Sequence, residues 1–220
     1  MSRRVIGIDG TRRGWVGVVW DGSTADPVFA PTLEQLCARA GAVEVVAVDI
    51  PIGLADDGRR PCDDAVRPLL GPRRSSLFVP PALGALDHDD YADANAWSKA
   101  TLERGIAKQA WMLVPKIIEA RAFADASSVT VHEAFPELAF RAMNDDTPMS
   151  HPKRSWTGMR ARLALLERHG VHVDADAGPA GEVAADDMID AAALAWSAMR
   201  ISIGTADHRP ETGPGPSIWW

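Results

Sequence analysis

Residues 6–20, IGIDGTRRGWVGVVW, hold two apolar runs separated by a short polar turn. The run that begins at Val5 is rich in β-branched residues, and Trp15–Trp20 resumes the pattern after the glycine-bounded turn. This arrangement predicts a β-hairpin. The first run ends on Asp9, although a strand of this kind is suited to burial. The position of that carboxylate therefore needs a physical reason.

Further strands are predicted downstream. Residues 43–51, VEVVAVDIP, form a near-continuous apolar run that ends on Asp49, a pattern typical of a strand covered on both faces. A short piece around Val28 and Phe29 and residues 127–135, SSVTVHEAF, are further strand candidates. Asp49 thus repeats the pattern seen at Asp9.

Helices are predicted between and after these strands. Thr32 is suited to cap one helix, and Pro115 is expected to break or kink the long helical stretch 93–126. The segments TGMRARLALLERHG and AADDMIDAAALAWSAMR predict two more, at residues 157–170 and 184–200. In contrast, Pro, Gly, Arg and Asp in residues 55–90 predict an excursion with little regular structure.

This order predicts an α/β fold with a mixed sheet, an opening antiparallel hairpin followed by parallel strands, flanked by helices. The 220 residues are expected to form a single domain over residues 1–220, with a helical and loop insertion at residues 55–126 after the fourth strand. The C-terminal Ile218, Trp219 and Trp220 are expected to be packed down, because two exposed tryptophans would be unusual.

The composition narrows the classes of function. A formal net charge of −7 argues against a protein that coats nucleic acid or anionic membrane through bulk positive charge. The two cysteines, Cys37 and Cys62, fit neither a disulfide framework nor a zinc site. The apolar run near the N-terminus is too short for a signal peptide, and no stretch reaches membrane-span length. We expect a cytoplasmic protein without membrane contact.

Asp9 and Asp49 both stand at strand ends, where aspartate also occurs as an ordinary turn residue. In open α/β sheets, however, ligands bind beyond the carboxyl ends of the strands. Neighbouring parallel strands would bring the two carboxylates within about 5 Å of each other. Like charges at that separation require a cation or a shared proton, and a divalent metal is the simplest solution.

The last predicted helix carries Asp187 and Asp190 three residues apart on one face. Asp187, like Asp186, can be explained as a first-turn residue favoured by the helix dipole. Asp190 lies in an apolar stretch that should be buried, and an unpaired buried carboxylate is costly. Asp190 therefore needs a metal, a base or water at its face.

Several motifs along the chain resemble one bacterial family. They are IGIDGTRRGWVGVV, VVAVDIPIGL, RPCDDAVRPLLGPRRSSLFVPP, KQAWMLVPKIIEA, VHEAFPELAF and DDMIDAAALAW. They look like the family called domain of unknown function 429, and the likeness covers nearly the whole chain. This resemblance implies a ribonuclease H-like fold and a nuclease activity.

Nucleases of that superfamily hold two magnesium ions with acidic residues from the first strand, the fourth strand and a late helix. The resemblance thus implies catalytic roles for Asp9, Asp49, Asp187 and Asp190, with Asp9, Asp49 and Asp190 as ligands of Mg or Mn. Two such metals activate a water and stabilise the leaving oxygen of a phosphodiester. Nucleic acid, or another phosphodiester, is the implied substrate.

Other residues also match the family motifs. Glu133 and Glu137 fit an outer-shell role, since Glu133 would lie about two strand spacings, roughly 10 Å, from Asp9. Lys116 could reach the site. His132 should alternate to the face opposite Glu133 and is interpreted as structural.

Basic residues suggest where a phosphate would bind. Guanidinium and hydroxyl groups in GPRRSS fit a phosphate contact, although the aspartates of this excursion also fit a solvated loop. The candidates for substrate binding are Arg73, Arg74, Ser75 and Ser76. A second basic group is interpreted as a solvated face around a helix start: Lys153, Arg154, Arg160, Arg162 and Arg168. Trp97, Trp111 and Trp156 are interpreted as core residues.

Two alternatives stay open. GIDGT also resembles the first phosphate loop of sugar kinases and actin-like ATPases, which would make the protein a nucleotide-binding phosphotransferase or ATPase. Those enzymes normally use two such domains and a second phosphate loop, and this sequence has no convincing second copy. The other alternative is a non-catalytic binding module of the same fold.

Overall fold

The protein is described here from a computed structural model that covers residues 3–213 and 215–220. Its centre is a five-stranded sheet in the order β3-β2-β1-β4-β5. The strands are β1 (Val5–Thr11), β2 (Gly14–Trp20), β3 (Ala25–Ala30), β4 (Val45–Val48) and β5 (Thr130–Glu133). Strands β1, β2 and β3 pair antiparallel, whereas β4 pairs parallel with both β1 and β5. The predicted α/β mixed sheet, with its opening hairpin and later parallel strands, is confirmed.

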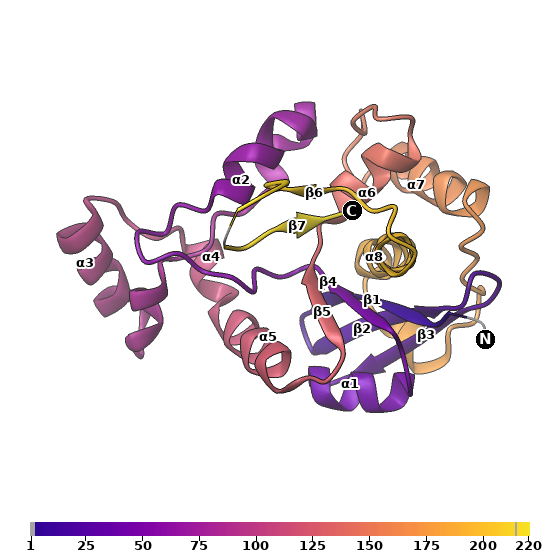
Figure 1. The fold of residues 1–220 in the computed structure, drawn as a ribbon, viewed down its shortest axis with the longest axis horizontal. Helices are drawn as coiled ribbons and strands as arrows, with labels where there is room; N and C mark the ends of the chain where they lie inside the picture. The colour runs from indigo at the N-terminus through magenta and orange to yellow at the C-terminus, as the bar shows by residue number, and fades with distance from the viewer. Residues whose placement is uncertain (1–2, 214) are drawn as a thin grey trace.

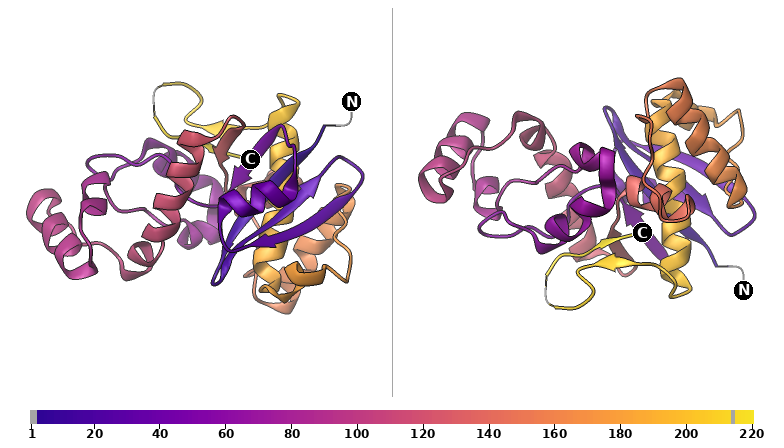
Figure 2. Two further views of the ribbon diagram at one scale, coloured as in Figure 1. Left: turned by 90° about the horizontal axis from the view of Figure 1, so that it is seen from below. Right: turned by 90° about the horizontal axis from the view of Figure 1, so that it is seen from above.

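Helices cover both faces of this sheet (Figure 1). Helix α8 (Ala185–Ser202) packs across β1, β2 and β4 on one face, with α6 (Pro136–Met143) and α7 (Trp156–Arg168) beyond it. Helices α1 (Leu33–Ala40) and α5 (Val114–Ala126) bury Leu36 and Ile117 against the other face. The sheet is therefore the middle layer of three: in Figure 2, α1 crosses in front of the strands in the view from below, and α8 crosses in front of them in the view from above.

The contact between α8 and β1 depends on small residues. A Cβ added at Gly7 would lie 2.0 Å from the Ala195 nitrogen and 2.3 Å from the Ala191 carbonyl oxygen. Glycine in β1 and alanines along α8 thus allow backbone to approach backbone. This close approach places the first turns of α8 beside the carboxyl end of β1.

Residues 55–90 are more regular than predicted. They contain α2 (Pro61–Val66) and the 3-10 helices η1 (Arg67–Ser76), kinked at Gly71, and η2 (Leu83–Asp87). The prediction of little regular structure is wrong, because proline is well placed in the first turn of a helix, where its missing N–H costs nothing.

The helical stretch that follows is divided into α3 (Tyr91–Leu102), α4 (Lys108–Met112) and α5. Glu103, in the left-handed conformation, ends α3, and Pro115 stands in the first turn of α5. The predicted break near Pro115 is confirmed. Among the described helices, none is long and apolar enough to cross a membrane.

The chain ends in a small antiparallel ribbon, β6 (His208–Arg209) with β7 (Ile218–Trp219). Ile218 and Trp220 are each only 2% exposed, so the prediction that the tail is packed down is confirmed. The His132 ring meets Trp219 edge-on at 4.7 Å between centroids, and Trp219 stacks on His208 at 4.1 Å. His132 therefore takes part in anchoring the tail.

The tryptophans fit their prediction only in part. Trp97 and Trp111 are half-buried and pack into a small apolar cluster near α3 and α4. Trp156 is 72% exposed, so its assignment to the core is wrong. It is the first residue of α7, directly after the N-cap Ser155, and Arg160 lies 5.8 Å from its ring centroid.

Candidate metal centre

Asp9 and Asp49 lie side by side at the carboxyl ends of β1 and β4. The Asp49 amide donates to the Ile8 carbonyl at 2.9 Å, which continues the parallel pairing of the two strands. The Gly10 amide donates to Asp9 Oδ1 at 2.6 Å, so the backbone of β1 itself orients this carboxylate. The predicted adjacency of the two strand ends is confirmed.

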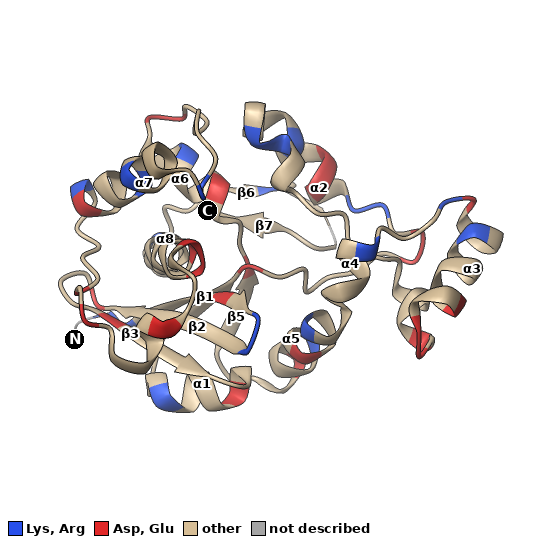
Figure 3. Cartoon of the chain, turned by 180° about the vertical axis from the view of Figure 1, so that it is seen from behind, with Lys and Arg blue, Asp and Glu red and all other residues tan. Residues whose placement is uncertain are grey.

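Asp190 reaches the same point from the second turn of α8. Its side chain is buried, at 3% exposed, among the apolar residues of that helix. One carboxylate oxygen from each of Asp9, Asp49 and Asp190 lies within 4.8 Å of the others. We call these three residues the carboxylate trio. Figure 3 shows acidic positions at the ends of the central strands and on the first turns of α8.

Burial and mutual repulsion perturb the acidity of the trio. Burial, together with the charges of Asp49 and Asp190, raises the pKa of Asp9 well above its usual range. Burial and the Asp190 charge raise the pKa of Asp49 to about 8. Burial raises the pKa of Asp190 to about 6, although Lys153 opposes this shift. The trio thus favours a proton or a cation at neutral pH.

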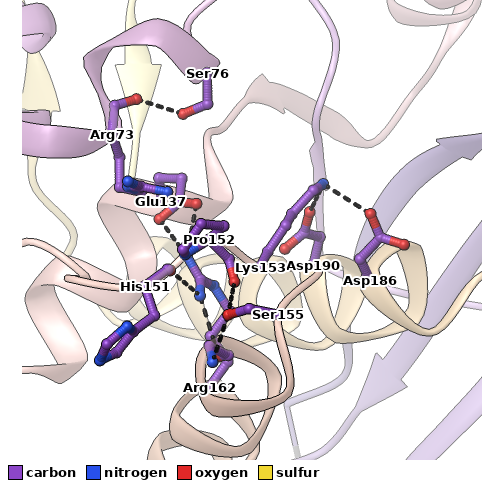
Figure 4. Close-up of polar contacts among 11 residues, drawn as sticks. Arg73, Ser76, Glu137, His151, Pro152, Lys153, Ser155, Arg162, Asp186 and Asp190 are labelled. Carbon is purple, nitrogen blue, oxygen red and sulfur yellow. Dashed lines mark hydrogen bonds and ion pairs between the residues drawn. The ribbon is translucent and has the colours of Figure 1, made fainter.

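Lys153 is part of this site, and the sequence interpretation missed it. Its ammonium lies 2.5 Å from Asp190 Oδ2 and 3.7 Å from Asp186 Oδ2 (Figure 4). Although burial lowers the pKa of Lys153, the Asp190 carboxylate raises it overall. The interpretation of Lys153 as part of a solvated face is therefore wrong.

Arg162 holds the loop that carries Lys153. Its guanidinium is fully buried and donates to both Glu137 oxygens at 2.7 and 2.8 Å. The same side chain donates to the carbonyls of His151 and Gly158, each at 3.1 Å (Figure 4). The assignment of Arg162 to a solvated face is wrong, because this arginine joins α6, α7 and the loop between them.

Asp187 and Lys116 lie at the margin of the trio. Asp187 is half-buried, and its charge contributes to the raised pKa of Asp9, but it is not one of the three clustered carboxylates. The Lys116 ammonium donates to the Gly14 carbonyl at 2.7 Å and lies 4.0 Å from the Trp15 ring centroid. Burial lowers the pKa of Lys116, while Glu119 and Asp9 oppose the effect.

Glu133 and Glu137, the predicted outer-shell residues, each form a buried ion pair. Glu133 ends β5, accepts from the Ile52 amide at 3.0 Å and pairs with the buried Arg60. Its charge contributes to the raised pKa of Asp49. Glu137 pairs with Arg162. Both carboxylates therefore hold segments that adjoin the trio.

The predicted substrate-binding residues of η1 are not in the trio. Arg74 and Ser75 are exposed, and the Ser76 hydroxyl donates to the Arg73 carbonyl at 2.6 Å (Figure 4). Arg73 is half-buried, and its Nε has no hydrogen-bond partner within the described part of the chain. Arg74 and Ser75 are thus accessible to a ligand, and the substrate-binding role of all four residues stays a prediction.

The chemistry of the trio suits a hard divalent cation. Carboxylate oxygens are the ligands that Mg²⁺ and Mn²⁺ prefer, and these come from three separate elements of the fold. Among the described residues, the one ammonium in ion-pair contact with the trio, Lys153, balances one of three negative charges. The donor set and the excess negative charge therefore both fit a metal.

Comparison with known proteins identifies one family. No curated protein and no solved structure matches the chain. The model of the family described as "Protein of unknown function (DUF429)" matches residues 7–214, and this span includes all three residues of the trio. The chain belongs to this family of unknown function.

Proposed function

We propose that this protein is a hydrolase that cleaves phosphodiesters with the help of Mg²⁺ or Mn²⁺, and that nucleic acid is its substrate. The observation that carries the proposal is the convergence of Asp9, Asp49 and Asp190, whose oxygens approach within 4.8 Å from β1, β4 and α8. Three carboxylates would not be gathered in a buried position for stability, because each raises the cost of charging the others.

Asp9, Asp49 and Asp190 would hold the metal. A divalent cation at this position supplies Lewis-acid polarisation of a phosphoryl oxygen and activation of water. The Gly10 amide, which donates to Asp9 Oδ1, fixes the orientation of one ligand before any substrate arrives. Such preorganisation is what a metal site of defined geometry requires.

Lys153 would exchange partners during this reaction. Its ammonium lies 2.5 Å from Asp190 Oδ2. With the carboxylate engaged elsewhere, the ammonium is free to bind a phosphate oxygen of the substrate, at a distance set by the clamped loop 151–155. Lys116, whose ammonium donates to the Gly14 carbonyl and interacts with the Asp9 charge, would contribute a second positive charge.

The choice of a phosphodiester is supported by the motif resemblance to nucleases of ribonuclease H-like fold. In those enzymes the acidic residues come from the first strand, the fourth strand and a late helix. In this chain the trio comes from β1, the residue after β4, and α8. The order of the elements therefore agrees with that expectation.

Metal binding is tested first and without substrate. Manganese(II) titrated into the full chain at pH 8, followed by electron paramagnetic resonance, is expected to show a bound ion that Asp9→Asn and Asp190→Asn each weaken by at least about a hundredfold. Asp26→Asn, which removes an exposed acid on β3, serves as the matched control. Equal binding by all four proteins would refute the metal centre.

Activity is tested separately. Single-stranded and duplex DNA, RNA, a branched junction and ATP are each incubated with the manganese-loaded protein and its Asp9→Asn variant. Strand cleavage that Asp9→Asn abolishes and Asp26→Asn retains is the expected result. Release of phosphate from ATP without strand cleavage would instead favour the kinase-like or ATPase alternative, and metal binding without turnover would favour a binding module.

A further inference from the structure

A cavity of about 280 Å³ with a mainly charged lining lies outside the carboxylate trio. It is formed where the chain leaves β4 and enters α2, and the turn after α3 closes it. Its charged lining consists of Arg59, Arg60, Arg104, Asp63 and Asp64. Arg60 is already paired with Asp63 and with Glu133, so Arg59 and Arg104 are the lining arginines whose charge is not used in a buried ion pair among the described residues.

One wall of the cavity is a buried ion pair with unused hydrogen-bonding capacity. Arg60 is 2% exposed and Asp63 is 3% exposed, and Arg60 Nη2 donates to Asp63 Oδ1 at 2.9 Å. The remaining guanidinium hydrogen bonds of Arg60 go to Glu133, to Cys62 and to the Gly53 carbonyl.

Two buried polar atoms of the Arg60–Asp63 pair are not accounted for by these hydrogen bonds. Arg60 Nε and Asp63 Oδ2 have no hydrogen-bond partner anywhere in residues 3–213 and 215–220. A buried donor or acceptor without a partner is unfavourable, because it has lost its hydrogen bonds to water without replacement. Each of these two buried side chains thus has one polar atom without a partner among the described residues.

The other charged side chains lie around this wall. Arg59 and Asp64 are exposed, and Arg104 donates to the Asp57 carbonyl at 2.5 Å. Gly58 allows this arrangement, because a Cβ added there would lie 2.2 Å from Arg104 Nη2. Arg104 therefore keeps donors available beside the cavity while one of its hydrogen bonds holds it in place.

We propose that this cavity binds a phosphomonoester group that retains one proton. The arginines donate to the anionic oxygens, as guanidinium groups commonly do with phosphate. Asp63 Oδ2 accepts the remaining P–O–H proton. A fully deprotonated anion such as sulfate would instead place an oxygen lone pair against the carboxylate, so the site selects phosphate over sulfate.

This inference goes beyond the proposed function, because none of the cavity residues belongs to the trio. The ligand chemistry has two sources, inorganic phosphate and the terminal phosphate of a nucleotide. Each is tested by isothermal titration of the full chain at pH 6, close to the second pKa of a phosphomonoester, with EDTA present to remove divalent metal. The probes are inorganic phosphate, sulfate, AMP and cyclic AMP.

Phosphate or AMP is expected to bind at least about tenfold more tightly than sulfate and cyclic AMP, the latter having no ionisable P–O–H. Tighter binding of AMP than of phosphate would assign the site to a nucleotide end, whereas equal binding would assign it to the phosphate group itself. Binding of sulfate or cyclic AMP as tight as that of AMP would overturn the proposal, as would no binding at millimolar concentrations of any probe.

Variants locate the binding. Arg104→Gln is expected to weaken phosphate binding about tenfold, while Arg160→Gln, which removes an exposed arginine from α7, leaves it unchanged. Asp63→Asn is expected to abolish the preference for phosphate over sulfate, because an amide can donate. If Asp63→Asn fails to fold, Arg59→Gln replaces it, with weakened phosphate binding expected. Equal binding by the Arg104 and Arg160 variants would overturn the assignment.

Discussion

Replacing Asp49 by Asn is expected to stabilise the metal-free protein while destroying its metal site. The carboxylate of Asp49 adjoins those of Asp9 and Asp190, and its pKa is raised from 3.8 to about 8. Between these two values the folded chain retains a proton that the unfolded chain has released. The free energy of unfolding of the wild-type protein therefore falls as the pH rises from about 4 to about 8.

The size of the effect follows from proton linkage. One proton bound only in the folded state changes the free energy of unfolding by about 1.4 kcal/mol per pH unit. From pH 5 to pH 7 the stability advantage of the Asp49→Asn variant over the wild type would grow by about 3 kcal/mol. Because the Asp49 side chain is only half-buried, solvent screening reduces this to roughly 1.5 to 3 kcal/mol.

The difference in free energy of unfolding between Asp49→Asn and the wild type is measured by urea unfolding at pH 5, 6 and 7 with EDTA. The variant Asp26→Asn is the control. Asp26 is an exposed acid on β3, and its replacement should leave the pH profile of stability unchanged. Manganese(II) should then stabilise the wild type and the control but not Asp49→Asn. A gap that stays constant or narrows with rising pH would refute the electrostatic account of the trio.

Three other predictions concern elements that support the site. Lys153→Gln should tighten manganese(II) binding at pH 8 about tenfold by calorimetry, because the ammonium no longer competes for Asp190, and weaker binding would contradict this competition. Gly7→Ala should cost about 3 kcal/mol or more in urea unfolding, because its Cβ would collide with the backbone of α8, and a near-neutral effect would show that the helix can shift. Arg162→Met should cost about 3 to 5 kcal/mol because it leaves Glu137 as an uncompensated buried charge, and the double variant with Glu137→Gln should regain much of that loss.

The features that could be predicted from the sequence are those that depend on patterns among neighbouring residues. The apolar runs on either side of Gly10–Gly14 indicated the β-hairpin, and the two apolar runs that end on aspartate became β1 and β4, which pair in parallel. Asp190 was identifiable because a charge inside an apolar helix is expensive without a partner. These signals depend on neighbours in sequence, which is why they could be interpreted without a structure.

The site residues that the sequence interpretation missed depend on contacts between segments that are distant in the sequence. Lys153 stands in a loop whose composition is that of any helix start, and it meets Asp190 only because α7 folds back along α8. Buried arginines such as Arg60 and Arg162 likewise have no local signature, since their cost is offset by glutamates 73 and 25 residues away. Prolines misled the interpretation of the excursion, because they begin helices as readily as they end them.

The arrangement of charges explains why a lysine alone does not complete the site. Lys153 forms ion pairs with Asp190 and Asp186, and among the described residues no ion pair joins a basic side chain to Asp9 or Asp49. The Lys116 ammonium, the next positive charge, is directed to the Gly14 carbonyl and the face of Trp15. Two of the three clustered carboxylates are thus left to a proton or to a cation from solution. A divalent ion satisfies both carboxylates while keeping them charged, whereas a proton satisfies a carboxylate only by removing its charge.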